Sequence, residues 1–340
     1  MNKLYLVFFL VSFALGIGIG FLVNLDGNEV DFNFAEIEKS IENLNIKEDK
    51  NFTTTLLFVG DIMLSRSIGN IMEKNKNYLF PFEFSIDFLK KADLTFGNLE
   101  GPISDKGKNQ GSIYSFRADP KVVEGLIESG FDILSIANNH IFDWGEPALL
   151  DTIDRLEKNN ISYIGVGKNY QEANEIKIKE INGTKFGFLG LTSLYPKSFW
   201  AKDNRVGLTE FDEDKILEKI KKAKENKIAD VIIISLHWGE EYQTVSNQFQ
   251  KNLAHKLVDV GADVVVGHHP HVAQDIERYK DGIIFYSLGN FVFDQNFSKE
   301  TMEGLVTEIK IKDSKIDKVN IYKAQMNKYY QPSIDFSYSF

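Results

Sequence analysis

The chain has 340 residues, 43% of them hydrophobic, and a formal net charge of −10 from 39 Lys and Arg against 49 Asp and Glu. This length supports one large core or two moderate ones, and the acidic balance argues against nucleic acid as a partner, because phosphate binding requires a basic face. The chain has no cysteine, which excludes disulfides and thiolate metal sites and leaves His, Asp, Glu or Asn as metal ligands.

The first apolar segment, residues 4–23, has the length that a helix needs to cross a bilayer. Lys3 precedes it and acidic residues follow it, so the positive-inside rule predicts that residues 1–3 are cytoplasmic and that everything after Val23 lies outside the membrane. A cleaved signal peptide is the alternative. The apolar run continues past the small-residue motif Ser12-Phe13-Ala14, which favours an uncleaved transmembrane signal anchor.

Residues 24–51 are polar and charged. Phe34, Ile37, Ile41 and Leu44 recur at helical spacing, but the stripe is too short for a coiled coil. We expect a spacer helix or a flexible stalk.

From residue 53 onward, short apolar strands alternate with helical patterns, and hairpins dominate the end of the chain. Helices are expected at 82–91, 120–129, 146–159, 212–224 and 247–260. Strands are expected at 54–59, 93–96, 133–136, 162–165, 176–180, 185–191, 231–236, 264–267, 274–278, 283–288, 304–311 and 316–322. The order predicts a layered α/β domain with mixed sheets over residues 52–326. The aromatic-rich tail, residues 327–340, is expected to fold back onto this domain, with a partner contact as the alternative.

A loop with the sequence Gly267-His268-His269-Pro270-His271 follows the strand expected at 264–267. Three of the six histidines of the chain lie here, and neutral imidazole is the commonest metal ligand. Because proline fixes its own φ and restricts the residue before it, we expect His269 and His271 to be held in an extended, rigid relation. A polar loop with chance histidines is the alternative.

Several acid, amide and imidazole side chains follow the carboxyl ends of predicted strands. They are Asp61, Asn98, Glu100, Asn138, Asn139, His140, Asp143, His237, His269 and His271. Each alone has an ordinary interpretation as a turn residue, a loop acid or a core histidine. Ligand sites in open α/β sheets form outside the carboxyl ends of strands, so the set predicts one cleft.

Hard oxygen ligands mixed with imidazole nitrogen suit Mn, Fe or Zn, as one or two ions. Two ions would clamp a phosphate-like group and activate water. His140 would then serve as a general acid oriented by Asp143. Arg66, Arg117 and Asn98 are candidate contacts to an anionic substrate, although ordinary surface or ion-pair roles explain the arginines equally well.

Six segments together resemble the CapA/PgsA family of capsule-synthesis proteins associated with poly-γ-glutamate. They are Gly-Asp-Ile-Met-Leu-Ser-Arg at 60–66, Gly-Asn-Leu-Glu at 97–100, Ala-Asn-Asn-His at 137–140 with Asp143 and Gly145, His-Trp-Gly-Glu-Glu-Tyr at 237–242, Gly-His-His-Pro-His at 267–271 and Ser-Leu-Gly-Asn-Phe-Val-Phe-Asp at 287–294. The resemblance implies one N-terminal anchor, which residues 4–23 match.

That family is in turn similar to calcineurin-like metallophosphoesterases, which implies a four-layer sandwich of two mixed sheets flanked by helices. The similarity implies a metal-ligand set of Asp61, Glu100, Asn139, His237, His269 and His271, with His140 as the catalytic member of the Asn-His pair. Two positions depart from the pattern. Met63 stands where a ligating histidine is expected, and a thioether binds hard divalent ions poorly. Glu100 stands where a shorter bridging aspartate is expected.

Two functions follow. The first is an accessory protein at the cell membrane, with its domain outside the cytoplasm, that works with membrane synthase subunits in synthesis, export or attachment of poly-γ-glutamate. The second is a metal-dependent hydrolase of phosphoester or γ-glutamyl substrates at the cell surface. The two are compatible, and a cell-surface binding domain with a decayed site is a third alternative.

Overall fold

The computed structural model describes residues 6–11, 18–23 and 53–339. The chain divides into two units, Met1–Lys50 and Asn51–Phe340.

In the first unit, β1 (Leu6–Val11) and β2 (Gly18–Val23) pair as antiparallel strands. The described part of this segment is therefore in strands, whereas one continuous helix is expected over residues 4–23, and the transmembrane helix is not confirmed. An uninterrupted apolar run has no periodicity that separates helix from strand, and its valines, phenylalanines and glycines lower helix propensity. Among the described residues, no helix has the length and apolarity needed to cross a bilayer. Residues 1–3 and the predicted spacer 24–51 lie outside the described residues, and membrane anchoring stays a prediction.

The second unit contains a larger sheet in the order β18-β17-β16-β3-β4-β5-β6, with β15 beside β3. Its strands are β3 (Thr54–Ile62), β4 (Leu94–Leu99), β5 (Ile133–Ser135), β6 (Ser162–Ile164), β15 (Asn290–Val292), β16 (Glu303–Lys312), β17 (Lys315–Met326) and β18 (Pro332–Ser339). Strands β3 to β6 run parallel, and β16 to β18 add antiparallel strands beside β3. Residues of the predicted tail thus form β18 against β17.

The smaller sheet has the order β13-β14-β12-β11-β9-β8. Its strands are β8 (Lys177–Ile181), β9 (Thr184–Thr192), β11 (Val231–His237), β12 (Val264–His268), β13 (Ile276–Tyr279) and β14 (Gly282–Phe285). The four central strands are parallel, and β8 and β13 pair antiparallel at the edges. Asn182 and Gly183, both with positive φ, turn the chain between β8 and β9 as the Asn-Gly hairpin signal predicts. A separate pair joins β7 (Val166–Gly167) to β10 (Gly207–Leu208).

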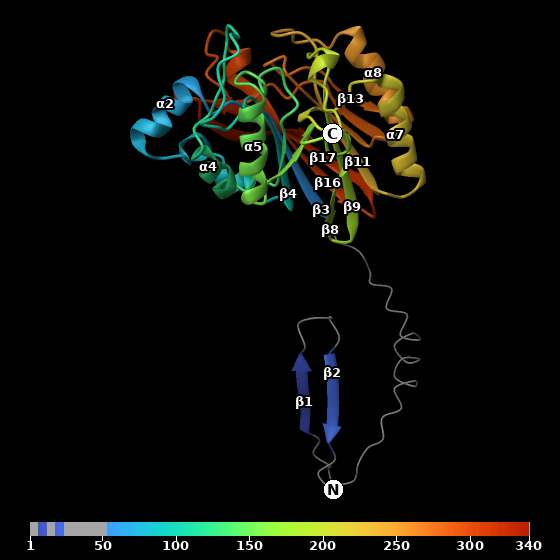
Figure 1. The fold of residues 1–340 in the computed structure, drawn as a ribbon. Helices are drawn as coiled ribbons and strands as arrows, with labels where there is room; N and C mark the ends of the chain where they lie inside the picture. Colours follow the sequence, from blue (N-terminus) through green and yellow to red (C-terminus); the bar gives the residue numbers. More distant parts are fainter. Residues whose placement is uncertain (1–5, 12–17, 24–52, 340) are drawn as a thin grey trace. The chain divides into compact units, whose positions relative to one another are not determined.

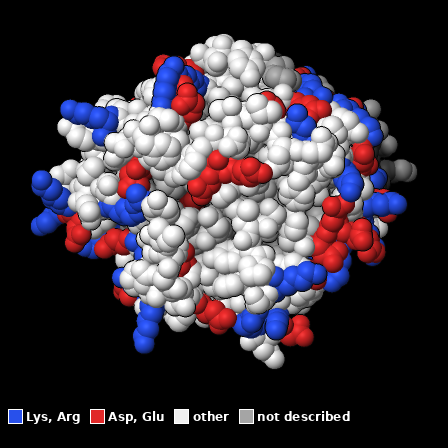
Figure 2. Space-filling model, turned by 90° about the horizontal axis from the view of Figure 1, so that it is seen from above, with Lys and Arg blue, Asp and Glu red and all other residues white. Residues whose placement is uncertain are grey.

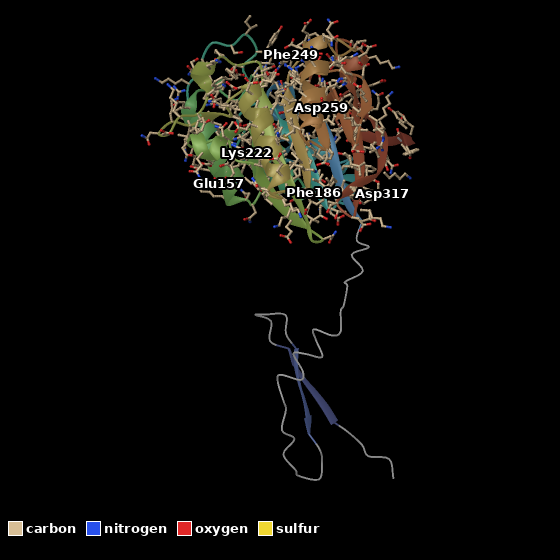
Figure 3. The ribbon with its side chains drawn as sticks, turned by 90° about the vertical axis from the view of Figure 1, so that its right-hand side faces the viewer. Glu157, Phe186, Lys222, Phe249, Asp259 and Asp317 are labelled. Atoms are coloured by element: carbon tan, nitrogen blue, oxygen red, sulfur yellow. The ribbon has the colours of Figure 1, made fainter. Side chains whose placement is uncertain are left out.

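Three hydrophobic layers hold the two sheets and the helices together. Phe58 and Phe96 of the larger sheet meet Phe188 and Ile233 of the smaller sheet in the central layer. The larger sheet packs its other face on α2 (Arg66–Asn75), α4 (Val122–Glu128) and α5 (Glu146–Lys158). The smaller sheet packs on α7 (Glu213–Glu225) and α8 (Gln248–Asp259). Figure 1 shows the helices on the two outer sides, and Figure 3 faces α7 and α8, marked by Lys222 and Asp259. The predicted α/β fold with mixed sheets and flanking helices is confirmed.

Local sequence sets the starts of the two helices that pack on the smaller sheet. Asp212 caps α7, and Asn247 caps α8 in a capping box with Gln250. The expected helix at 82–91 is wrong, because that stretch forms only turns, the single-turn helix α3 (Ile86–Leu89) and the end of a 3₁₀ segment, Phe80–Phe82. Helix α2 is not among the helices expected from the sequence. The remaining short elements are α6 (Tyr170–Ala173) and the 3₁₀ segments Lys197–Phe199 and Glu300–Met302.

Parallel pairing aligns polar residues across the carboxyl ends of both sheets. Asp61 on β3 lies opposite Asn98 on β4, and Asn290 on β15 lies opposite Asp61 on its other side. In the smaller sheet, His237 on β11 lies opposite His268 on β12. The register therefore delivers the polar cluster to one end of the sandwich.

We predict that Asn247→Ala lowers the free energy of unfolding by about 1 kcal/mol, because the first turn of α8 loses its side-chain acceptor. Urea unfolding followed by tryptophan fluorescence measures this change. Asn226→Ala is the control, because Asn226 is an exposed asparagine at the C-cap of α7 and does not cap a helix N-terminus. This substitution should leave the urea midpoint unchanged. Equal midpoints for all three proteins would contradict the assignment of a stabilising cap.

Candidate metal centre

Asp61 is a fully buried carboxylate near the end of β3. It accepts hydrogen bonds from Nδ2 of Asn98 at 2.8 Å and from the backbone N–H of His269 at 3.2 Å. Nδ1 of His268 lies 3.2 Å from its Oδ1, and Nδ1 of His271 lies 3.5 Å from its Oδ2. Burial alone raises the pKa of a carboxyl group, but the neighbouring imidazoles of His268 and His271 hold the pKa of Asp61 well below its ordinary value. Asp61 is therefore ionised at neutral pH.

Glu100 is the second buried carboxylate and directly follows β4. Its Oε1 lies 3.7 Å from Nε2 of His271 and 3.8 Å from Nε2 of His140, without a hydrogen-bond partner among the described residues. Burial raises its pKa well above the ordinary value, against the opposing charge of His271. At pH 7 this pair therefore carries at least one proton in the metal-free protein.

His237 ends β11 and faces the larger sheet. Its Nε2 lies 2.8 Å from Oδ1 of Asn139, and its Nδ1 lies 3.4 Å from Nδ2 of Asn98. Burial and the nearby imidazole of His269 keep its pKa well below the ordinary value. His237 is therefore a neutral imidazole at pH 7, the form that binds metals.

The loop after β12 brings His269 and His271 into the same cluster, with ring centroids 5.9 Å apart. Burial, followed by the charge of His271, lowers the pKa of His269 to about 3. Burial also acts to lower the pKa of His271, but the charges of Glu100 and Asp61 raise it to about 9. The backbone differs from the extended form expected beside Pro270, because φ is 98° at His269 and 58° at His271. Positive φ is costly for residues other than glycine, and such strain is often stored at functional sites.

His140 and Asp143 have the arrangement expected of a catalytic acid and the carboxylate that orients it. Nδ1 of His140 is 2.7 Å from Oδ2 of Asp143, and that oxygen also accepts the backbone N–H of Phe116 at 2.8 Å. The ring of Phe116 packs against His140 at a tilt of 31°, with centroids 3.9 Å apart. The imidazole is thus fixed with Nε2 directed toward Glu100.

The three residues predicted to contact substrate, Asn98, Arg66 and Arg117, have different surroundings in the structure. Asn98 is fully buried and its amide donates to Asp61, which favours positioning of that carboxylate over substrate contact. Arg66 is partly exposed, pairs with Asp294 at 3.3 Å and lies 5.5 Å above the ring of Phe116. Arg117 stacks on Trp144 at 3.4 Å and has no contact with the cluster among those described.

The donors fit a divalent metal ion. Asp61, Glu100 and His237 each offer a ligand atom within 4.8 Å of the others, and all three side chains are buried. Oε1 of Glu100 and Nδ1 of His269 are buried without a hydrogen-bond partner among the described residues. Each such atom costs about 1–3 kcal/mol, and a cation would satisfy both.

A second group of donors includes a residue that the sequence analysis did not count as a ligand. Glu241, His269 and His271 also have ligand atoms within 4.8 Å of one another. Glu241 lies in a loop after β11, four residues beyond His237, and its only sequence signal is its place in the His-Trp-Gly-Glu-Glu-Tyr segment.

A cavity of about 660 Å³ opens beside this cluster, with Asn139, Asp143, Tyr195, Phe199 and Arg205 in its wall. The hydroxyl of Tyr195 donates to the carbonyl oxygen of Asn139 at 3.1 Å. The cavity thus shares Asn139 and Asp143 with the cluster and offers room for a substrate group.

Comparison with known proteins identifies the family. The bacterial capsule synthesis protein family PGA_cap matches residues 55–295, which include every residue of the cluster. The chain belongs to this family. The resemblance to capsule-synthesis proteins drawn from the six segments is therefore confirmed.

Relatives of the chain include two Bacillus proteins. Capsule biosynthesis protein CapA of Bacillus anthracis is 37% identical over 268 residues, 77% of this chain and 65% of that protein. PGA biosynthesis protein CapA of Bacillus subtilis (strain 168) is 35% identical over 252 residues, 73% of this chain and 66% of that protein. The chain thus covers slightly less than two thirds of the length of either relative.

Among solved structures, a hypothetical protein from Thermus thermophilus superposes with a TM-score of 0.50 at 17% identity, over 80% of this chain and 99% of that one. The 5′-nucleotidase precursor from the same organism has a TM-score of 0.49 at 12% identity, over 83% of this chain and 56% of that one. The first similarity supports the fold alone.

We predict that binding of Zn²⁺ at pH 7 by metal-free protein releases about one proton, because an ion displaces the proton that Glu100 and His271 hold. Because the pKa of His271 is raised to about 9, protons compete with Zn²⁺ for this residue below pH 9. The apparent affinity for Zn²⁺ therefore increases from pH 6 to pH 8. Calorimetry in buffers with different ionisation enthalpies measures the release. His255→Ala, whose imidazole pairs with Glu277 instead, is the control and should release the same proton. A release of zero in all buffers would contradict the protonation proposed for the pair.

Proposed function

We propose that the chain is a membrane-anchored, extracytoplasmic component of capsule production that uses a divalent metal centre on poly-γ-glutamate or another anionic polymer. The observation that carries this proposal is that the family match at residues 55–295 encloses a buried cluster of carboxylates and imidazoles fit for a metal. The names of the two Bacillus relatives, which refer to capsule and PGA biosynthesis, support the polymer class.

The apolar segment at residues 4–23 supports the anchor by its length, and the charges around it support the outward orientation. An anchored domain outside the membrane would act where a polymer leaves the cell. Its expected partners are the membrane subunits that synthesise or export that polymer.

An acidic protein needs a local positive potential to hold a polyanion. Figure 2 views the sandwich from above and shows Asp and Glu near the middle of this face, with most Lys and Arg toward its margin. This face therefore has no basic groove at its middle. A divalent cation in the cluster would supply the positive charge, and the mixed oxygen and nitrogen donors suit Mn, Fe or Zn.

The residues that would hold one or two such ions are Asp61, Glu100, Asn139, His237, His269 and His271. A bound divalent ion supplies Lewis acidity toward a carbonyl or phosphoryl oxygen. Asp143 holds His140 by its Nδ1, so that Nε2 stands ready to donate a proton to a leaving group. Phe116 covers one face of the imidazole and limits the access of water.

The second candidate function, a cell-surface hydrolase of phosphoester or γ-glutamyl bonds, is favoured by the cavity beside Asn139 and Asp143. A binding domain needs no oriented acid, whereas His140 is oriented both by a carboxylate and by an aromatic ring packed against it. The two functions are compatible, since a capsule component can also trim the polymer.

We predict that deletion of the gene in a capsule-forming host lowers the polymer by roughly tenfold or more, and that Asp61→Asn fails to restore it because the cluster loses its ionised carboxylate. Glutamate released by acid hydrolysis of cell-bound and shed polymer measures both pools. Asp335→Asn, an exposed position on β18, is the matched control and should restore wild-type amounts. Unchanged polymer after deletion would refute the capsule role.

For the hydrolase, we predict that His140→Gln lowers kcat by about 10²–10⁴-fold while the bound metal is retained, because only the proton donor is lost. The full chain, loaded with Mn²⁺ or Zn²⁺, is assayed on p-nitrophenyl phosphate and on a γ-linked glutamate oligomer, with metal content by elemental analysis. His255→Gln serves as the control. No turnover of either substrate by the metal-loaded wild type would contradict the hydrolase hypothesis. Equal turnover by wild type and His140→Gln would contradict the role of His140 as proton donor.

A further inference from the structure

The position two residues after Asp61 offers no ligand for an ion. Met63 is fully buried, and its sulfur accepts hydrogen bonds from the backbone N–H of Ser65 at 3.2 Å and from its hydroxyl at 3.0 Å. A thioether is a poor ligand for hard divalent ions in any case. A second ion in this cluster must therefore take a donor from another element.

We propose that Glu241 is this donor, and that with His269 and His271 it forms an outer ion position distinct from an inner one made by Asp61, Glu100 and His237. The proposal rests on the metal centre proposed above and adds a ligand to it. The ligand atoms of each group lie within 4.8 Å of one another.

Backbone contacts fix the loop that carries Glu241 against the histidine loop. The N–H of Tyr242 donates to the carbonyl oxygen of Pro270, between the two histidines, at 2.8 Å. The amide of Gln274 donates to the carbonyl oxygen of Gln243 at 2.7 Å. Glu241 is thus held in register with His269 and His271 by the main chain on its C-terminal side.

Both histidines have a ring nitrogen available for an ion. The amide of Asn290 donates to the carbonyl oxygen of Thr301 at 3.0 Å, which orients its Oδ1 to accept Nδ1–H of His271 at 3.0 Å. This second bond fixes the tautomer and leaves Nε2 as the ligand atom. Nδ1 of His269 is buried and has no hydrogen-bond partner among the described residues.

The two positions differ in exposure and charge. All three side chains of the inner position are buried, whereas Glu241 is exposed. Two carboxylates neutralise an inner divalent ion, whereas one carboxylate and two neutral imidazoles leave an outer ion with a net charge of about +1. The outer ion is therefore the one that attracts an anionic substrate and the one that exchanges more readily with solvent.

The test is the Zn²⁺ content of the purified full chain after dialysis against buffers of fixed free Zn²⁺, measured by elemental analysis. We expect two equivalents in wild type, and Glu241→Gln should lose one of them or bind it at least tenfold more weakly. Glu240→Gln removes the neighbouring exposed carboxylate and is the matched control, which should keep both equivalents. Circular dichroism and the Tm of each metal-free variant report whether it folds like the wild type.

His271→Ala and the double variant with Glu241→Gln identify which ion is lost. If both residues hold the outer ion, either change removes it, and the double variant loses no more than His271→Ala alone. An unchanged Zn²⁺ content in Glu241→Gln, with wild type binding one or two equivalents, would overturn the assignment of Glu241 and leave the proposed metal centre intact. A wild type that binds no Zn²⁺ would instead overturn that centre and this assignment together.

Discussion

A carboxylate buried between two sheets is the constraint on which the rest of the site depends. Asp61 is fully buried, and an ionised carboxylate in such a place is stable only if charge and hydrogen bonds compensate it. The compensation comes from both sheets, with Asn98 from the larger one and His268, His269 and His271 from the end of the smaller one. The need to satisfy this one charge thus ties the carboxyl ends of the two sheets together.

The packing of the core supports the strained loops that hold the cluster. His269, His271 and Tyr242 all have positive φ, which costs of the order of 1–3 kcal/mol for each residue. Strand β12 lies so close to its neighbours that a Cβ on Gly267 would come within 1.9 Å of the carbonyl oxygen of Tyr286. Close packing at β12 leaves the histidine loop little freedom.

Sequence patterns predicted the parts of the structure that depend on local chemistry. The Asn182-Gly183 hairpin, the helices α7 and α8 and most strands follow from turn residues and periodicity. Helix α2 was missed because its first residue, Arg66, has a φ of 53° and no side-chain cap marks its start. The proximity of Glu241 to His269 and His271 depends on a backbone contact between two loops, which no local pattern contains.

A decayed site is a poor explanation of the cluster. Two buried carboxylates and several imidazoles with unpaired atoms reduce the stability of a fold, and apolar residues of similar volume usually increase it. The one position that departs most from a metal-binding pattern, Met63, is instead packed in the core with its sulfur paired to Ser65. The sulfur of Met63 thus has hydrogen-bond donors, whereas polar atoms of the cluster, such as Oε1 of Glu100 and Nδ1 of His269, have no partner among the described residues. That combination is expected of a site that binds a cation through other ligands, and not of one that has lost its use.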